Sequence, residues 1–346
     1  MPDQLTRPPT WRAIFGDYVH SVAVAPTDDA IAVGSLSGEA ALVGDNGAII
    51  AALPGHPLGT LSVAWSTDGS LVATGGQDGV ARVSTRDGRT VATASGKGWV
   101  AALAWAPTSS HLGVACGREV LVIDLATGRQ QVFGPLASTV TALHWAPNGT
   151  RLGATSYGGV SWFDLQQPDL TRPARHHPFK GAPLSLVVDP TGKWACAGYQ
   201  DASIHLWKLW SGDDLAMSGY PAKIEHLGFR SDGQWMASAC LDELTVWDFS
   251  GKGPRGRQPA VGAAHDRHIS CLAWQPHGNI LATGGADGRL VLWPSPHSVK
   301  APLAPVAVWE LDAAVSALAW TADGAAVVVG TSDGGVEWHQ VRGVQV

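Results

Sequence analysis

The sequence predicts an all-β fold, and three observations support this prediction. The chain of 346 residues contains 42 Gly, and it contains 16 Trp, which is an unusually high number. Abundant turn formers together with many aromatic residues are typical of short strands joined by tight turns. The third observation is a sequence unit that recurs along nearly the whole chain.

The recurring unit is an apolar strand that ends on an aromatic or apolar residue, here called the anchor, and is followed by a turn containing Pro, Asn, Asp or Gly. Leu61-Ser-Val-Ala-Trp-Ser-Thr-Asp-Gly69 is a clear copy. Anchors are 40 to 46 residues apart, a period that indicates a propeller built from four-stranded blades. Eight copies predict eight blades, with anchors at Val24, Trp65, Trp105, Trp145, Val188, Phe229, Trp274 and Trp320.

Each copy also predicts the rest of its blade. The turn after the anchor leads into a second apolar strand, such as residues 71–74 or 280–283. A second turn, such as Asp287-Gly288, leads into a third strand that ends on an aromatic residue such as Trp293. The alternation of apolar residues and the turn chemistry support these strands. A fourth, weaker strand then reaches the next copy.

The two ends of the chain are predicted to close the ring. Residues 10–15, within an N-terminal closing segment 1–18, supply an outer strand beside the last strand at residues 335–340. Such a closure protects the sheet edges from pairing with other chains. The chain is therefore predicted to form a single domain, residues 1–346. Seven blades with one irregular extension is the alternative, because the copy ending at Val24 is the weakest.

Residues 19–346 resemble the WD40 family, down to the dipeptide Trp247-Asp248. The resemblance implies a fold rather than an activity. It also implies a hydrogen-bonded tetrad of His, Ser or Thr, Asp and Trp within a blade. One copy has all four residues, and a second has three of them with Ser84 in the Trp position: His265, Thr283, Asp287 and Trp293, then His56, Thr74 and Asp78.

Composition and missing motifs exclude several functions. The formal net charge is -6 and charged residues make up 15% of the chain, so we expect no nucleic-acid partner. The sequence has no apolar run long enough to span a membrane and no signal peptide, so we expect a cytoplasmic protein with no membrane partner. It has no phosphate-binding loop, dinucleotide fingerprint or hydrolase motif, so we expect neither catalysis nor a cofactor.

The residues six or seven positions before each anchor, and the turns between second and third strands, should lie at one rim of the ring. Exposed Tyr, Trp and Arg side chains are typical anchors of protein interfaces. We therefore expect a non-catalytic protein-protein interaction scaffold that docks a protein or peptide around the central channel. The candidate contact residues are Tyr18, Trp99, Tyr157, Tyr199, Lys223, Arg267 and His268.

Two other functions remain open from the sequence. The 13 His residues, with His20, His226 and His268 near the channel, suggest a small-molecule or metal-binding propeller that acts as an accessory in metal homeostasis. We predict no metal site, because His265 belongs to the tetrad and neighbouring strand residues face opposite sides. A hydrolase or isomerase in the channel is the less favoured alternative, and it would depend on His20 and Glu225.

Overall fold

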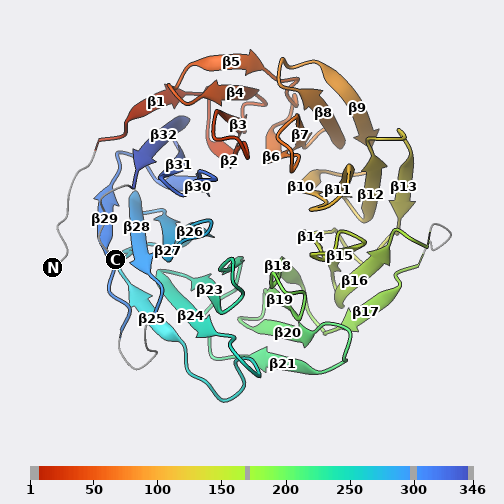
Figure 1. The fold of residues 1–346 in the computed structure, drawn as a ribbon, viewed down its shortest axis with the longest axis vertical. Coiled ribbons are helices and arrows are strands. Elements are labelled where there is room, and N and C mark those ends of the chain that lie inside the picture. Colours follow the sequence, from red (N-terminus) through yellow and green to blue (C-terminus); the bar gives the residue numbers. More distant parts are fainter. Residues whose placement is uncertain (1–7, 168–171, 297–301, 342–346) are drawn as a thin grey trace.

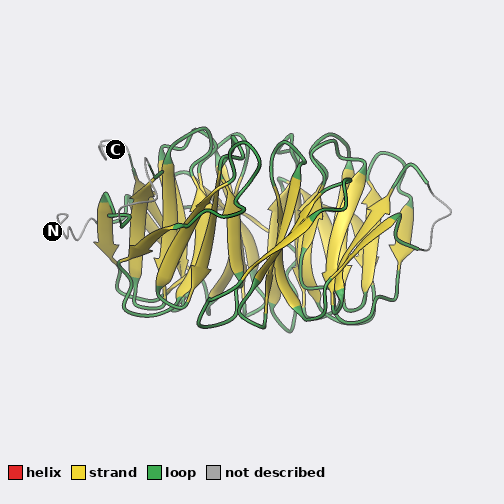
Figure 2. Ribbon diagram, turned by 90° about the horizontal axis from the view of Figure 1, so that it is seen from below, coloured by secondary structure: helices red, strands yellow, loops and turns green. Residues whose placement is uncertain are grey.

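The computed structural model describes residues 8–167, 172–296 and 302–341. Within these residues it confirms the all-β propeller: eight four-stranded antiparallel sheets stand around a central axis like the blades of a fan (Figure 1). Seen from the side, the ring is a flat disc whose loops gather on two opposite faces (Figure 2). The described residues include no helix, and hence no helix that could cross a membrane.

The strands follow the chain from blade to blade. Blades 1 to 4 comprise β2 (Val19–Val24), β3 (Ala30–Ser35), β4 (Ala40–Gly44) and β5 (Ile49–Ala52); β6 (Thr60–Trp65), β7 (Leu71–Gly76), β8 (Val80–Thr85) and β9 (Thr90–Ser95); β10 (Val100–Trp105), β11 (His111–Cys116), β12 (Glu119–Asp124) and β13 (Gln130–Phe133); β14 (Leu143–Trp145), β15 (Arg151–Ser156), β16 (Gly159–Asp164) and β17 (Arg175–Pro178). Blades 5 to 7 comprise β18 (Pro183–Val188), β19 (Trp194–Tyr199), β20 (Ile204–Lys208) and β21 (Asp214–Met217); β22 (His226–Phe229), β23 (Trp235–Cys240), β24 (Glu243–Asp248) and β25 (Ala260–Ala263); β26 (Ile269–Trp274), β27 (Ile280–Gly285), β28 (Arg289–Pro294) and β29 (Ala307–Glu310).

Blade 8 joins the two ends of the chain and closes the ring. Its three inner strands are β30 (Val315–Trp320), β31 (Ala326–Thr331) and β32 (Gly335–Gln340), and its outer strand is β1 (Trp11–Ile14). The register pairs Trp11 with Trp338 and Ile14 with Gly335. Arg12 adds an ion pair of 2.6 Å to Asp333. The predicted closure and the count of eight blades are therefore confirmed, while residues 1–7 of the predicted closing segment lie outside the described residues.

All eight predicted anchors are the last residues of the innermost strands, and the five Trp anchors tie neighbouring blades together. Each indole N–H donates a hydrogen bond to a backbone carbonyl of the preceding blade, one residue before that blade's own anchor. The N–O distances are 2.8–3.1 Å, for the pairs Trp65–Ala23, Trp105–Ala64, Trp145–Ala104, Trp274–Gly228 and Trp320–Ala273. We call these contacts indole latches. We call the contact between two neighbouring blades a seam. The anchors Val24, Val188 and Phe229 carry no indole, so three of the eight seams lack a latch.

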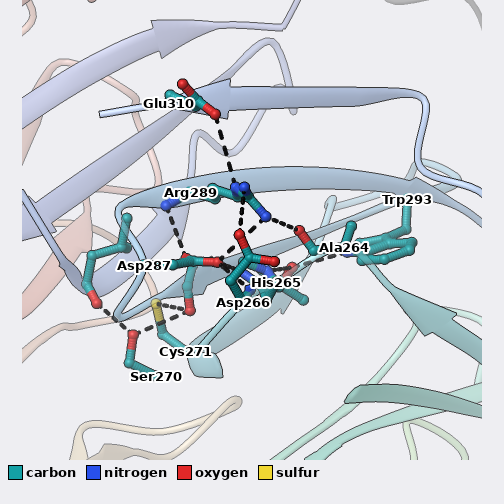
Figure 3. Close-up of polar contacts among 12 residues, drawn as sticks. Ala264, His265, Asp266, Ser270, Cys271, Asp287, Arg289, Trp293 and Glu310 are labelled. Atoms are coloured by element: carbon teal, nitrogen blue, oxygen red, sulfur yellow. Dashed lines mark hydrogen bonds and ion pairs between the residues drawn. The ribbon is translucent and has the colours of Figure 1, made fainter. Parts of the chain in front are cut away.

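The tetrad in blade 7 forms as the WD40 resemblance implies, and Figure 3 labels three of its members, His265, Asp287 and Trp293. His265 Nδ1 lies 3.1 Å from an Asp287 carboxylate oxygen, so this nitrogen carries the hydrogen. Its Nε2 accepts the hydroxyl hydrogen of Thr283 at 2.8 Å, and the same hydroxyl oxygen accepts the Trp293 indole N–H at 2.8 Å. Burial lowers the pKa of His265, which favours the neutral ring that this chain of bonds requires.

Blade 2 forms the shorter version of the network. His56 contacts Asp78 at 2.7 Å and Thr74 at 3.0 Å. Ser84 supplies no indole, and Arg82 instead pairs with Asp78 at 3.0 Å.

Blade 6 builds an equivalent network from different residues. Tyr220 stands four positions before a buried Ile, as His265 does in blade 7. Its hydroxyl group lies 3.1 Å from Ser238 and 3.2 Å from Thr245, and it accepts the indole N–H of Trp247 at 2.9 Å. A phenol thus replaces the imidazole at the centre of the polar network. This network was not predicted from the sequence, because the blade has no His at the position of Tyr220.

The seam between blades 4 and 5 has no indole latch and is instead filled by packed aromatic rings. His177 on β17 is buried and stacks on Trp207, with ring centres 5.7 Å apart. Trp162 lies over Gly153, where a Cβ atom would come within 3.0 Å of the ring. Among the described residues, both His177 ring nitrogens and the indole nitrogens of Trp162 and Trp207 have no hydrogen-bond partner. Burial lowers the pKa of His177 to about 4.

The indole latches should contribute measurably to stability. Trp145→Phe removes one N–H donor and part of a buried ring, so we expect the free energy of unfolding to fall by about 1–3 kcal/mol. Urea denaturation followed by circular dichroism measures this change. Trp99→Phe is the matched control, because Trp99 is 59% exposed; it should change the free energy of unfolding by less than about 0.5 kcal/mol. Equal effects of the two substitutions would contradict the role of the latch.

The buried His177 should make stability depend on pH. Its folded pKa of about 4 lies below the ordinary value of 6.5, so between these values the unfolded chain binds more protons. The free energy of unfolding should therefore fall as pH falls through this window. Relative to His177→Phe, we expect the wild type to lose about 2 kcal/mol between about pH 7 and about pH 5.

The neighbouring His176 offers a matched control, because it lies on the same strand but is exposed. His176→Phe should keep the wild-type pH dependence in the same denaturation experiment. A His177→Phe variant that follows the wild-type profile would show that His177 is not the group responsible.

Candidate functional site

The candidate site is the face formed by the loops that enter the innermost strands and by the turns between second and third strands, here called the upper face. Counting six residues back from an anchor does place that residue against the neighbouring turn. In six blades its carbonyl accepts a hydrogen bond of 2.9–3.1 Å from the turn, in the pairs Tyr18–Leu36, Gly59–Gln77, Trp99–Gly117, Ala182–Gln200, His268–Ala286 and Ala314–Ser332. These bonds fix the backbone from which the rim side chains project.

Trp99 and Tyr157 provide the exposed aromatic surface on adjacent blades 3 and 4. Trp99 precedes β10 and is 59% exposed, and Tyr157 follows β15 and is 51% exposed. The backbone N–H of Tyr157 donates to the Ser138 hydroxyl at 2.8 Å. Large apolar rings held in water by a fixed backbone are available for contact with a partner.

Exposed cations lie in the same loop as Trp99 and in neighbouring loops of the upper face. Lys97 lies in the loop that carries Trp99, Arg118 lies in the next turn, and Lys180 lies in the loop that enters blade 5. The Arg118 guanidinium donates to the Leu136 carbonyl at 2.8 Å, which holds its side chain near the rim. The upper face of blades 3 to 5 therefore combines aromatic rings with positive charge. We call this group of residues, Lys97, Trp99, Arg118, Tyr157 and Lys180, the aromatic arc.

The prediction that Tyr199 is exposed is wrong. Tyr199 is the last residue of β19, and its ring is fully buried. Side chains of a strand alternate between faces, so Tyr199 points the same way as Ala195 and Ala197, into the seam between blades 4 and 5. There it packs edge-on against Phe179, with ring centres 4.7 Å apart. The sequence pattern predicted that Tyr199 lies in the turn, whereas β19 extends through Tyr199.

Tyr18 is half-buried in blade 1, so it offers only part of its ring to the upper face. It lies beside His20, with ring centres 6.1 Å apart. Desolvation raises the pKa of Tyr18 and lowers the pKa of His20. This blade is separated from the aromatic arc by blade 2.

Lys223 and His268 come together at a pocket between blades 6 and 7, here called the rim pocket. Its volume is about 300 Å³, and its lining consists of Ala222, Lys223, Glu225, His226, Ala239, Leu241, His268 and Ile269. Lys223 pairs with Glu225 at 2.9 Å. Burial lowers the pKa of His226, with nearby Glu225 opposing this effect. Arg267 is exposed next to His268.

Two exposed apolar residues on this face were not selected as candidate contact residues. Leu241 is 50% exposed and has a φ of 53°, a left-handed conformation that costs energy for a residue other than glycine. Leu58 is 66% exposed and lies one residue before Gly59 at the rim. Leu58 stands seven residues before its anchor Trp65, a position that the count includes, but it was not selected as a contact residue. The left-handed φ of Leu241 has no signal in the sequence.

The side chains required for the metal-binding alternative and for the channel enzyme do not come together at one site. Glu225 pairs with Lys223 in blade 6, whereas His20 stands beside Tyr18 in blade 1. Of the three channel histidines, His226 and His268 share the rim pocket and His20 does not. In the described parts of the chain, no group of three or more His, Cys, Asp or Glu side chains could hold a metal ion.

Comparison with protein families identifies the repeats. The family model described as "WD domain, G-beta repeat" matches residues 47–83, 173–208 and 257–294. The first and third segments contain the polar networks of blades 2 and 7.

Several curated proteins match parts of the chain. Periodic tryptophan protein 2 homolog from Schizosaccharomyces pombe is 31% identical over 31% of this chain and 12% of its own length. Small ribosomal subunit protein RACK1y from Oryza sativa subsp. japonica is 29% identical over 32% of this chain and 33% of its own length. Actin-interacting protein 1-2 from Arabidopsis thaliana is 30% identical over 32% of this chain and 18% of its own length. The matches thus span no more than a third of these three relatives.

The whole ring is similar to solved structures. The crystal structure of Sqt1 from Chaetomium thermophilum aligns with a TM-score of 0.85, covering 97% of this chain and 98% of that chain at 18% identity. The computationally designed Ika8 protein aligns with a TM-score of 0.76 at 17% identity. At these identities the similarity shows the fold alone.

Proposed function

Because the chain is a WD40-repeat propeller of eight blades, we propose that it is a non-catalytic scaffold that docks a protein or peptide partner on its upper face. The observation that carries the proposal is the aromatic arc. Trp99 and Tyr157 are more than half exposed on adjacent blades, while the backbone beneath each ring is held by hydrogen bonds. A fixed backbone reduces the entropy lost when a partner binds.

The charge around the arc favours one kind of partner. Lys97, Arg118 and Lys180 are exposed near the two rings, although the chain as a whole has a net charge of -6. A partner segment with Asp or Glu residues beside an apolar side chain would match both features. Two relatives support an interaction role through their names, which place one in the small ribosomal subunit and connect the other with actin.

The rim pocket could serve the same partner. It lies on the same face as the arc, and its apolar walls include the exposed Leu241. A segment that crosses the inner rim from blade 3 to blade 7 could contact both regions. We therefore assign Lys223, Arg267 and His268 to the outer part of the contact surface, and we remove Tyr199 from it.

A Trp99→Ala/Tyr157→Ala double variant tests the proposal. The tagged wild type and the double variant are incubated with lysate of the native host, and captured proteins are quantified by mass spectrometry. We expect one partner to be captured by the wild type and to be lost at least about 10-fold with the double variant, because interface aromatic residues carry much of the binding energy.

The matched control is Ile49→Ala/Val132→Ala, which removes two equally exposed apolar side chains from outer strands of the ring. It should retain the partner, and all three proteins should melt at similar temperatures. A partner captured equally by the wild type and the double variant would contradict docking on the aromatic arc.

A further inference from the structure

An apolar pocket at the innermost strands lies on the opposite side from the aromatic arc. It occupies the ends of the innermost strands in blades 3 to 6 and the first turns that follow them, which define the lower face. Its volume is about 430 Å³, within the range of roughly 300–1,000 Å³ for ligand pockets. The lining residues are Ala104, Trp105, Pro107, Leu143, His144, Trp145, Pro147, Val187, Val188, Pro190 and Phe229.

The pocket coincides with the interruption of the indole latches. On one side it is lined by Trp105 and Trp145, whose indoles bond to the preceding blades. On the other side the anchors are Val188 and Phe229, which have no N–H to donate. If Val188 were a Trp, the spacing of the other latches would place its bond on the carbonyl of His144. The pocket thus lies beside the anchors Trp105 and Trp145, at the place where the repeat lacks the indole of the next anchor.

His144 gives this pocket one defined polar group. Its Nδ1 lies 2.8 Å from the Trp145 carbonyl, and because a carbonyl only accepts, Nδ1 carries the hydrogen. The other nitrogen, Nε2, is then a hydrogen-bond acceptor in the neutral ring. Burial lowers the pKa of His144, which favours this neutral form. Among the described residues no Asp, Glu, Lys or Arg lines the pocket, so these residues offer no counter-charge to an ionised ligand.

We propose that this lower pocket binds a planar aromatic group that carries one N–H or O–H donor, such as an indole or a phenol. The ring would pack against Trp105, Trp145, Phe229 and the three prolines, and its donor would bond to His144 Nε2. This chemistry matches that of the Trp anchors, which combine a flat ring with a single N–H. The group can belong to a free small molecule or to a Trp or Tyr side chain of a partner.

Isothermal titration calorimetry with four probes tests the proposal on the intact chain. Indole supplies the ring and the donor, while benzofuran has the same shape with an oxygen in place of the N–H. We expect indole to bind at one site about five-fold more tightly than benzofuran, as one added hydrogen bond gives. Phenol should bind more tightly than toluene for the same reason. Equal binding of indole and benzofuran, or no binding of any probe, would overturn the proposal.

Two variants assign the binding to this pocket. His144→Phe keeps a ring but removes the acceptor, so indole should bind no more tightly than benzofuran. Ala104→Phe fills the pocket and should weaken indole binding at least about 10-fold. Ala64→Phe is the matched control, because Ala64 has the same position in blade 2, its carbonyl also accepts an indole, and it does not line the pocket.

The Ala64→Phe variant should bind indole as the wild type does, and cooperative thermal melting establishes that each variant is folded. Unchanged indole binding by Ala104→Phe would place the site elsewhere and overturn the proposal. A further titration with N-acetyl-L-tryptophanamide distinguishes the two sources. Binding of this probe would favour a partner's side chain, whereas binding of free indole alone would favour a small molecule.

Discussion

The bond from a Trp indole to the carbonyl of the preceding blade is the interaction on which the ring depends. Each blade contacts only its neighbours, so the ring keeps its shape only if every seam is held. Five indole N–H groups supply one directional bond each at the inner edge, where the blades converge. Pairing of β1 with β32 then joins the chain ends within one sheet. The rim loops of the upper face are positioned by this inner framework.

The seams without a latch account for much of what is particular to this protein. Blade 5 alone among the eight has an unlatched seam on both sides, at Val188 and at Phe229. The seam with blade 4 is filled by Trp162, His177 and Trp207, whose ring nitrogens have no hydrogen-bond partner in the part of the chain that the structure describes. Apolar contact thus replaces directional bonds there. The lower pocket opens beside the same two anchors.

Much of the fold could be predicted because each position of the repeat is occupied by residue types that have one structural role. An aromatic or apolar residue at the end of an inner strand fills the space between blades, so all eight anchors were located from the repeated strand-and-turn pattern and its spacing. The polar network of blade 6 could not be predicted in this way, because Tyr220 fulfils the role of His with a different functional group. The prediction for Tyr199 was wrong because it ended the strand before this residue. Side chains alternate along a strand, so an error of one residue at its end reverses the expected direction of the side chain.

The candidate site was predictable only in part. The exposure of Trp99 and Tyr157 followed from counting along the repeat, since the turns at the rim have a regular length. The rim pocket requires Lys223 from blade 6 and His268 from blade 7 to meet, and no local pattern encodes that distance. The tautomer of His144 likewise depends on a contact that appears only in three dimensions.

Native-state hydrogen exchange, read by mass spectrometry on peptides from each blade, tests the role of the indole latches most directly. With increasing denaturant, β18, β19 and β20 of blade 5 should lose protection first, because no latch holds either of its seams. The strands of blades 2 and 3, which have latches on both sides, should lose protection later. Loss of protection in blades 2 and 3 before blade 5, or at the same denaturant concentration in all blades, would contradict this account.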